Sequence, residues 1–152
     1  MYEQKLKKFI SDNNILCEHL SFNQSCHSVE EAAHAANANT EDFVKNICMI
    51  DSDDNLIVAI VKGNDSASAT RIGKALNIDR PRTATPEEIL EKIGYPCGGT
   101  PSFGYKAKFL IDPRVMEKDT VYTGGGSQNS LVKISTKELQ NANQGEVIKI
   151  RR

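Results

Sequence analysis

The sequence predicts a mixed α/β fold in a single domain. A chain of 152 residues is long enough to bury one core and too short for two ordinary domains. Hydrophobic residues make up 39% of the chain and charged residues 26%, which is ordinary for a globular protein. Segments with apolar residues at helical spacing alternate with short β-rich runs. We therefore expect residues 1–152 to form one compact domain in which helices surround a β-sheet.

The first half of the chain is predicted to contain helices and a β-hairpin. Tyr2, Leu6 and Phe9 recur at helical spacing, and Ser28 with Glu31 has the form of a capping box at a helix start. Two apolar runs flank the polar turn 51–55, as in a hairpin. The expected helices cover the first dozen residues, 28–36 and 67–76, and the expected strands cover 15–20, 44–50, 56–61 and 80–84.

The second half is predicted to begin with a well-marked helix. Thr85 is a suitable N-cap, Pro86 suits the first helical position, and Glu88 completes a capping box. Gly94 follows the last periodic residue and ends this helix. A loop then leads to an expected strand at 106–111. Further strands are expected at 121–123, 130–134 and 147–150, with a helix that begins at the capping box 135–138.

Charge and cysteine content narrow the possible partners and compartment. The net charge of −1 gives no strong field for nucleic acid, so a polyanion would need a local patch. The longest apolar run is far shorter than a membrane span, and the first residues lack a signal peptide core. The four cysteines form no CxxC pair, and Cys26, His27 and His34 lack the usual spacing of a zinc site. We expect free thiols, no metal, no membrane partner and a cytoplasmic location.

Two features raise the question of a functional site. Lys45 is a charge inside an apolar strand, so it either reaches solvent at the strand end or lines a pocket. The stretch GYPCGGTPSFGY at 94–105 is either a rigid turn or a backbone cradle for a substrate. Cys97 within it would need a histidine to act as a nucleophile, and nothing in the local sequence supplies one. Neither this loop nor 124–126 matches a dinucleotide or P-loop motif.

The order of these motifs resembles the YbaK and prolyl-tRNA synthetase editing-domain family over residues 22–140. The matching pieces are Ser28 to Ala33, Phe43 to Asn46, Thr85 to Leu90, Gly94 to Gly104, Asp112 and Gly124 to Ser127. The resemblance implies a mixed α/β fold with a curved or barrel-like sheet. It also implies hydrolysis of wrongly charged aminoacyl-tRNA without a cofactor.

The resemblance assigns roles to particular residues. Lys45 matches a family lysine that holds a phosphate near the tRNA 3′ end. The glycine-rich motif, which lines the aminoacyl pocket in relatives, matches Gly94, Gly98, Gly99, Thr100, Pro101 and Gly104. Asp112 matches an acidic residue of editing domains, although Asp-Pro also marks a turn or a helix start. The histidine that some synthetase-linked relatives carry near the second glycine loop has no counterpart at 127–131.

The leading hypothesis is a deacylase that acts in trans on the 3′ acceptor end of mischarged tRNA. The expected catalytic residues are Lys45, Gly98 and Gly99, with main-chain N–H groups of Gly98 and Gly99 holding the ester carbonyl. A ribose hydroxyl of the tRNA is expected to help activate water, and small amino acids such as alanine or cysteine on tRNA-Pro are the expected cargo. Prolyl-tRNA synthetase is compatible with this role as a partner, whereas DNA is not expected. The alternatives are a binding module without turnover and a hydrolase that depends on Cys97.

Overall fold

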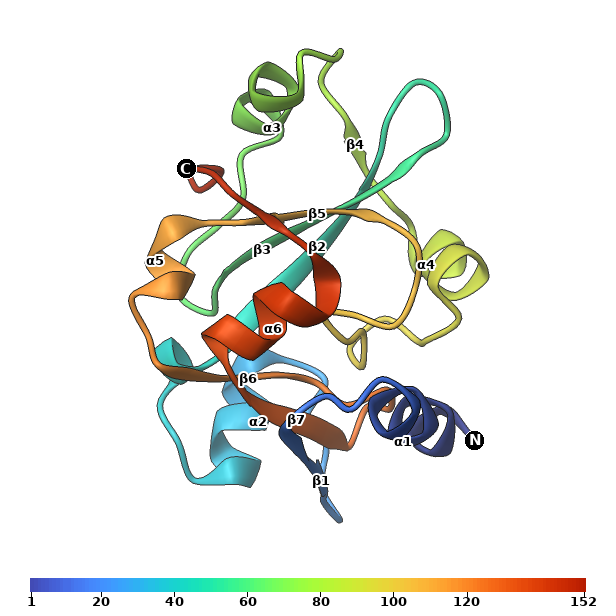
Figure 1. The fold of residues 1–152 in the computed structure, drawn as a ribbon, viewed down its shortest axis with the longest axis vertical. Helices are drawn as coiled ribbons and strands as arrows, with labels where there is room; N and C mark the ends of the chain where they lie inside the picture. The colour runs from blue at the N-terminus through green and yellow to red at the C-terminus, as the bar shows by residue number, and fades with distance from the viewer.

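Two β-sheets form the framework of the computed structural model, which describes residues 1–152 (Figure 1). The three-stranded sheet has the order β1 (Cys17–Ser21), β7 (Ser130–Ser135) and β6 (Thr120–Gly124), all antiparallel. The five-stranded sheet has the order β4 (Arg82–Thr83), β2 (Val44–Ile50), β3 (Leu56–Lys62), β5 (Lys108–Ile111) and β8 (Glu146–Val147). A parallel bridge between Phe43 and Tyr122 joins the two sheets. The mixed α/β prediction is confirmed.

The hairpin of β2 and β3 lies at the centre of the larger sheet. Its register runs from Val44 opposite Lys62 to Ile50 opposite Leu56. Strand β3 pairs in parallel with β5, and its residues from Leu56 to Val61 are all buried. A strand that is covered on both faces needs apolar side chains at successive positions, which explains why β3 is a continuous apolar run.

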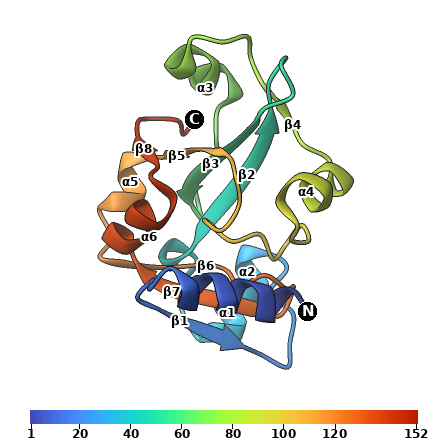
Figure 2. The ribbon, with the colours of Figure 1, turned by 45° about the vertical axis from the view of Figure 1, so that its right-hand side comes forward.

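Helices cover both faces of this sheet (Figures 1 and 2). The helices are α1 (Tyr2–Asp12), α2 (Val29–Ala36), α3 (Ala69–Leu76), α4 (Pro86–Ile93), α5 (Pro113–Met116) and α6 (Thr136–Asn143), with a 3-10 turn at Thr40–Asp42. Ile72 of α3 packs on one face of the sheet, together with Ile57 and Leu110. Ile89 of α4 and Leu139 of α6 belong to the larger core on the other face, which also includes residues of the three-stranded sheet. None of the helices is long and apolar enough to cross a membrane.

The helix starts lie where the capping residues predict them. The hydroxyl groups of Ser28, Thr85 and Ser135 each accept a hydrogen bond from the backbone N–H three residues on, at 3.1–3.2 Å. Gly94 ends α4 with a φ of 85°, in the left-handed region that favours glycine. The N-cap Ser68 starts α3 two residues later than the periodicity suggests.

Several expected strands are shorter than predicted, and the one expected at 106–111 covers only Lys108–Ile111. The segment 80–84 contributes only Arg82–Thr83 to the sheet, and the last strand covers Glu146–Val147 instead of 147–150. After Val147 the chain leaves the strand ladder, and the N–H of Ile150 donates to the carboxylate of Asp112. A side chain replaces the neighbouring strand as hydrogen-bond acceptor there, so the sheet ends early.

Candidate functional site

A cavity of about 180 Å³ lies where the start of β2 meets the end of β6, the N-terminal end of α2 and the loop that follows α4. Most of its wall is apolar, with Val29, Phe43 and Leu131 among the lining side chains. The polar residues that line it are His27, Ser28, Lys45, Asn46, Thr100 and Thr123. An apolar cavity with a few convergent polar groups is typical of a small-molecule site.

Lys45 provides a positive charge at this cavity. It is half-buried near the start of β2, and its Nζ donates to the backbone carbonyl of Asp65 at 3.0 Å. The carboxylate of Asp65 does not pair with Lys45; it accepts from Arg114 at 3.1 Å. A neutral carbonyl therefore holds the ammonium in place and leaves its charge uncompensated by a direct ion pair.

Asn46 connects the cavity wall to the glycine-rich loop. Its Nδ2 donates to the carbonyl of Thr100 at 2.9 Å and to Oγ1 of Thr123 at 3.0 Å. The hydroxyl of Ser102 donates to Oδ1 of Asn46 at 2.7 Å and lies 2.7 Å from the Thr123 hydroxyl. Ser102 and Thr123 are almost completely buried, so this network satisfies polar groups that have no access to water. The sequence contained a signal for it, a second polar residue beside Lys45 in an apolar strand.

Two residues of the glycine-rich loop that line the cavity have main-chain N–H groups without a partner in the protein. Gly98 and Thr100 both line it, and their N–H groups donate to no other group of the protein. The N–H of Gly99 is instead used in a turn, where it donates to the carbonyl of Pro96 at 3.0 Å. The N–H of Gly99 is thus engaged within the loop, whereas those of Gly98 and Thr100 have no partner in the protein. The assignment of Gly98 and Gly99 as donors to an ester stays a prediction.

The two glycine-rich loops pack backbone against backbone. A Cβ at Gly99 would lie 2.6 Å from the carbonyl oxygen of Ser127, and a Cβ at Gly124 would collide with the carbonyl of Thr100. The N–H of Gly126 donates to the carbonyl of Gly99 at 2.8 Å. Glycine is required at 99 and 124 because any side chain would separate the loops. The second loop is thus a support for the first.

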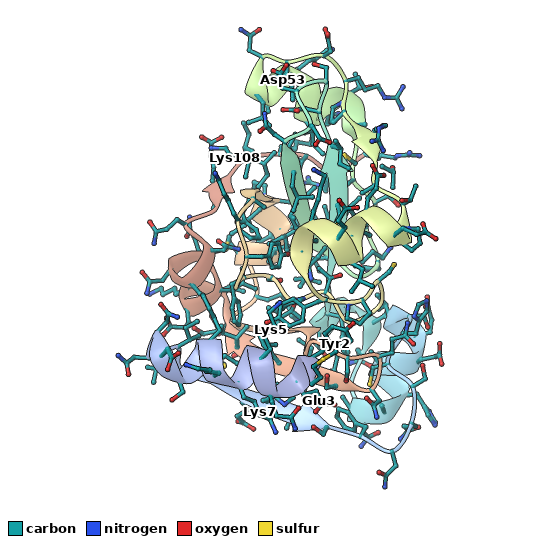
Figure 3. All side chains as sticks on the ribbon, turned by 90° about the vertical axis from the view of Figure 1, so that its right-hand side faces the viewer. Tyr2, Glu3, Lys5, Lys7, Asp53 and Lys108 are labelled. Atoms are coloured by element: carbon teal, nitrogen blue, oxygen red, sulfur yellow. The ribbon has the colours of Figure 1, made fainter.

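Three other residues of the motif hold the loop from outside the cavity. The carbonyl of Gly94 accepts from Lys5 at 3.3 Å, and the same ammonium lies 4.6 Å from the ring centre of Tyr95. Figure 3 shows Lys5 on the side of α1 that faces this loop, whereas Lys7 points away. Gly104 packs against Phe9 of α1, and the buried Pro101 accepts a hydrogen bond from Tyr105. None of the three lines the cavity.

Asp112 lies away from the cavity and organises the C-terminal segment. Its carboxylate accepts from the N–H groups of Arg114, Ile150 and Arg151 at 3.0–3.1 Å and from the Arg151 guanidinium at 2.9 Å. Burial tends to raise the pKa of Asp112, but these hydrogen bonds outweigh it and hold the pKa below its usual value. Every hydrogen bond of this carboxylate joins it to the protein's own backbone or to Arg151, and Asp112 does not line the cavity. A substrate contact of Asp112 stays a prediction.

The structure brings His27 to the cavity beside the loop that contains Cys97, which sequence reasoning missed. The ring Nδ1 of His27 occupies the space that a Cβ at residue 98 would fill. The imidazole makes no hydrogen bond to Cys97, whose carbonyl accepts from Gln128 at 3.1 Å. Burial raises the pKa of Cys26, and it raises the pKa of Cys48 to about 12. The geometry gives no activated thiol.

The sequence is similar to that of a known domain family and of two known proteins. A model of the aminoacyl-tRNA editing domain matches residues 23–142. The uncharacterized protein YwhH of Bacillus subtilis is 25% identical over 120 residues, which cover 78% of this chain and 76% of YwhH. A proline-tRNA ligase of Anaeromyxobacter sp. is 30% identical over 74 residues, or 48% of this chain and 13% of the ligase.

Solved structures share the fold over nearly the whole chain. A proposed trans-editing enzyme for prolyl-tRNA synthetase superposes with a TM-score of 0.91 at 20% identity, with 99% of this chain and 97% of that chain covered. The hypothetical protein APE2540 gives a TM-score of 0.89 at 23% identity, with 97% and 99% covered.

Proposed function

The chain belongs to the aminoacyl-tRNA editing-domain family, and we propose that it acts in trans to hydrolyse the ester bond of mischarged aminoacyl-tRNA. One observation carries this proposal. Lys45, Gly98 and Thr100 line the same cavity, and the N–H groups of Gly98 and Thr100 have no partner in the protein. A cation for a phosphate and two donors for an ester carbonyl are the groups that the acylated end of a tRNA requires.

Lys45 is proposed to hold a phosphate near the 3′ end of the tRNA. Its ammonium is fixed by the Asp65 carbonyl, and no carboxylate lies in a salt bridge with it. An anion that binds there gains a charge-assisted hydrogen bond without first breaking an ion pair. The phosphate contact would place the terminal ribose and its ester over the glycine-rich loop.

The chemistry is proposed to depend on the main chain. The ester carbonyl oxygen accepts from the N–H groups of Gly98 and Thr100, and negative charge develops on it as water attacks the carbonyl carbon. One such donor contributes on the order of 10² to 10³ in rate in other enzymes. The bond from the carbonyl carbon to the ribose oxygen breaks, and the proton from water passes to that oxygen. A neighbouring ribose hydroxyl is proposed to orient the water, and no carboxylate lines the cavity.

The cavity favours a small amino acid. Its volume of about 180 Å³ and its apolar wall suit side chains such as those of alanine or cysteine. A hydrophobic pocket separates substrates that differ by one methylene by about 1–3 kcal/mol. The similarity to a proline-tRNA ligase and to a proposed trans-editing enzyme makes tRNA-Pro the first tRNA to test.

The test is a deacylation panel with a matched lysine control. The protein is incubated with tRNA-Pro charged with alanine, cysteine or proline, and released amino acid is measured under single-turnover conditions. Lys45→Ala is expected to lower the rate by about 10² or more, since it removes the phosphate contact that positions the ester. Lys108→Ala is expected to keep the wild-type rate, because Lys108 is exposed and pairs with Ile57 at the opposite end of the sheet. If the wild-type protein releases no amino acid from any mischarged tRNA, the binding-module alternative replaces the enzyme.

A further inference from the structure

The imidazole of His27 lies at the opening of the cavity, directly against Gly98. His27 is exposed and also lines the cavity, and its ring fills the position where residue 98 would carry a Cβ. Gly98 has a φ of 90°, so glycine is needed there for the backbone as well as for the ring contact. The imidazole therefore packs against the residue that carries one of the two unpartnered main-chain N–H groups.

Hydrogen bonds fix the segment that carries His27. The N–H of Cys26 donates to the carbonyl of Gln128 at 2.6 Å, and the side chain of Gln128 donates to the carbonyl of Cys97 at 3.1 Å. Gln128 thus connects the residue before His27 with the residue before Gly98. The N-cap Ser28 begins α2 immediately afterwards. The backbone around His27 is held on both sides, so the ring contact with Gly98 is a built feature of the site.

The ring nitrogens of His27 remain available to a ligand. The residue's only hydrogen bond is made by its backbone N–H, which donates to Ser25 at 3.2 Å. Other polar side chains of the cavity already make hydrogen bonds within the protein. Lys45 donates to the Asp65 carbonyl, and Asn46 binds Thr100, Ser102 and Thr123.

We propose that His27 contacts the aminoacyl group and determines which amino acids the site accepts. This inference rests on the proposed function, because it assumes that the ester lies at the Gly98 N–H. An aminoacyl group held there has the imidazole beside it, and the ring limits the space for the amino-acid side chain. Gln128 is the positioning residue that keeps the ring in this place.

Substitution of His27 tests the inference through the substrate profile. His27→Ala should open the cavity and shift the ratio of kcat/KM for valyl-tRNA over alanyl-tRNA upward by about tenfold or more, which is the range expected for an altered hydrophobic pocket. His27→Phe should keep the wild-type preference, because it restores a ring of similar size. His34→Ala is the matched control, since His34 is an exposed histidine of α2 that does not line the cavity. Gln128→Ala should shift the profile in the same direction as His27→Ala, by a smaller factor.

A second measurement does not depend on turnover. Adenosine that carries alanine through a 3′-amide instead of an ester cannot be hydrolysed as an ester, and its binding can be followed by NMR of the histidine rings. The ring signals that disappear in His27→Ala should shift when this amide is added to the wild-type protein, while those of His34 should not. A variant that fails to fold would be recognised by its circular dichroism, and the amide titration of the wild-type protein would still decide the contact.

The outcomes separate the two proposals. Hydrolysis with an altered profile in His27→Ala supports both. Hydrolysis with an unchanged profile and silent His27 signals overturns the role of His27 alone. If no tRNA is hydrolysed but the amide shifts the His27 signals, the enzyme proposal fails and the contact stands. If there is neither hydrolysis nor a shift, the inference about His27 is overturned as well.

Discussion

At the scale of single residues, Asn46 makes three side-chain hydrogen bonds to two other segments of the chain. One amide group binds a hydroxyl on β6, a hydroxyl in the glycine-rich loop and the carbonyl of Thr100. All these partners are buried or nearly so, and an unmatched donor or acceptor among them would cost about 1–3 kcal/mol. Asn46, the residue beside Lys45, therefore joins β2 to β6 and to the glycine-rich loop.

We expect Asn46→Ala to lower the free energy of unfolding by about 2–3 kcal/mol, because it leaves the Ser102 hydroxyl and the Thr100 carbonyl without this partner. Ser102→Ala should cost less, and the double variant should cost less than the sum, since both changes break the same network. Urea unfolding of the four proteins measures the coupling. Strictly additive losses would show that the two side chains act independently.

At the scale of elements, Asp112 connects three parts of the chain. It follows β5, caps the short helix α5 and accepts N–H groups from the C-terminal segment. The sequence suggested both a substrate contact and a helix start for this Asp-Pro pair, and the structure shows the helix start. Its hydrogen bonds also explain why β8 is shorter than the apolar pattern predicts.

Stability should depend on the charge of this carboxylate. The pKa of Asp112 is lower in the folded protein than the ordinary value of 3.8. The contribution of this carboxylate to the free energy of unfolding is therefore complete above pH 3.8. It is lost as the pH falls through the lower pKa of the folded protein. Asp112→Asn should lower the free energy of unfolding by about 2–4 kcal/mol at pH 7, because the amide turns a donor toward backbone N–H groups.

The pH dependence of this difference provides the check. Urea unfolding of the wild-type protein and of Asp112→Asn should show that their difference shrinks below about pH 4, where the carboxyl begins to be protonated. Asp53→Asn is the control, since Asp53 is exposed in the turn between β2 and β3 (Figure 3). A difference that stays constant from pH 7 to pH 3 would contradict the assignment.

At the scale of the whole molecule, the net charge and the pairing of basic side chains both limit the number of phosphates that the protein can bind. The net charge of −1 provides no general attraction for a polyanion. The cation at the cavity, Lys45, is held by a carbonyl, whereas several other basic side chains lie in ion pairs, among them Arg114 and Lys118. Recognition should therefore depend on few phosphates near the tRNA 3′ end.

The salt dependence of binding tests this limit. Each phosphate contact with a single strand contributes about 0.7 to the slope of log affinity against log salt concentration. We expect a slope of about 1–2 for uncharged tRNA, and Lys45→Ala should reduce it by about 0.7. Lys108→Ala should leave the slope unchanged. A wild-type slope of about 5 or more would indicate a broad basic surface instead.

Much of the fold can be predicted from the sequence, because it depends on near neighbours. The caps at Ser28, Thr85 and Ser135 act within one helical turn, and the β2–β3 hairpin follows from two apolar runs and a short turn. The ordered motifs also identified the family. Lys45, Gly98 and Thr100 were named from the sequence, and the structure brings these three to one cavity.

The rest was decided by contacts between distant segments. Asn46 and Ser102 are 56 positions apart, and Asp112 and Ile150 are 38 positions apart. His27 lies against Gly98 where the segment between β1 and α2 is hydrogen-bonded to the backbone of Gln128 and Asn129. Periodicity and capping describe interactions along one element, and they contain no information about which loops meet. The sequence by itself determined most of the elements and the family, because capping and periodicity act along one element. The tertiary structure decided which loop N–H groups are free and which imidazole packs against Gly98, because these depend on segments far apart in the chain.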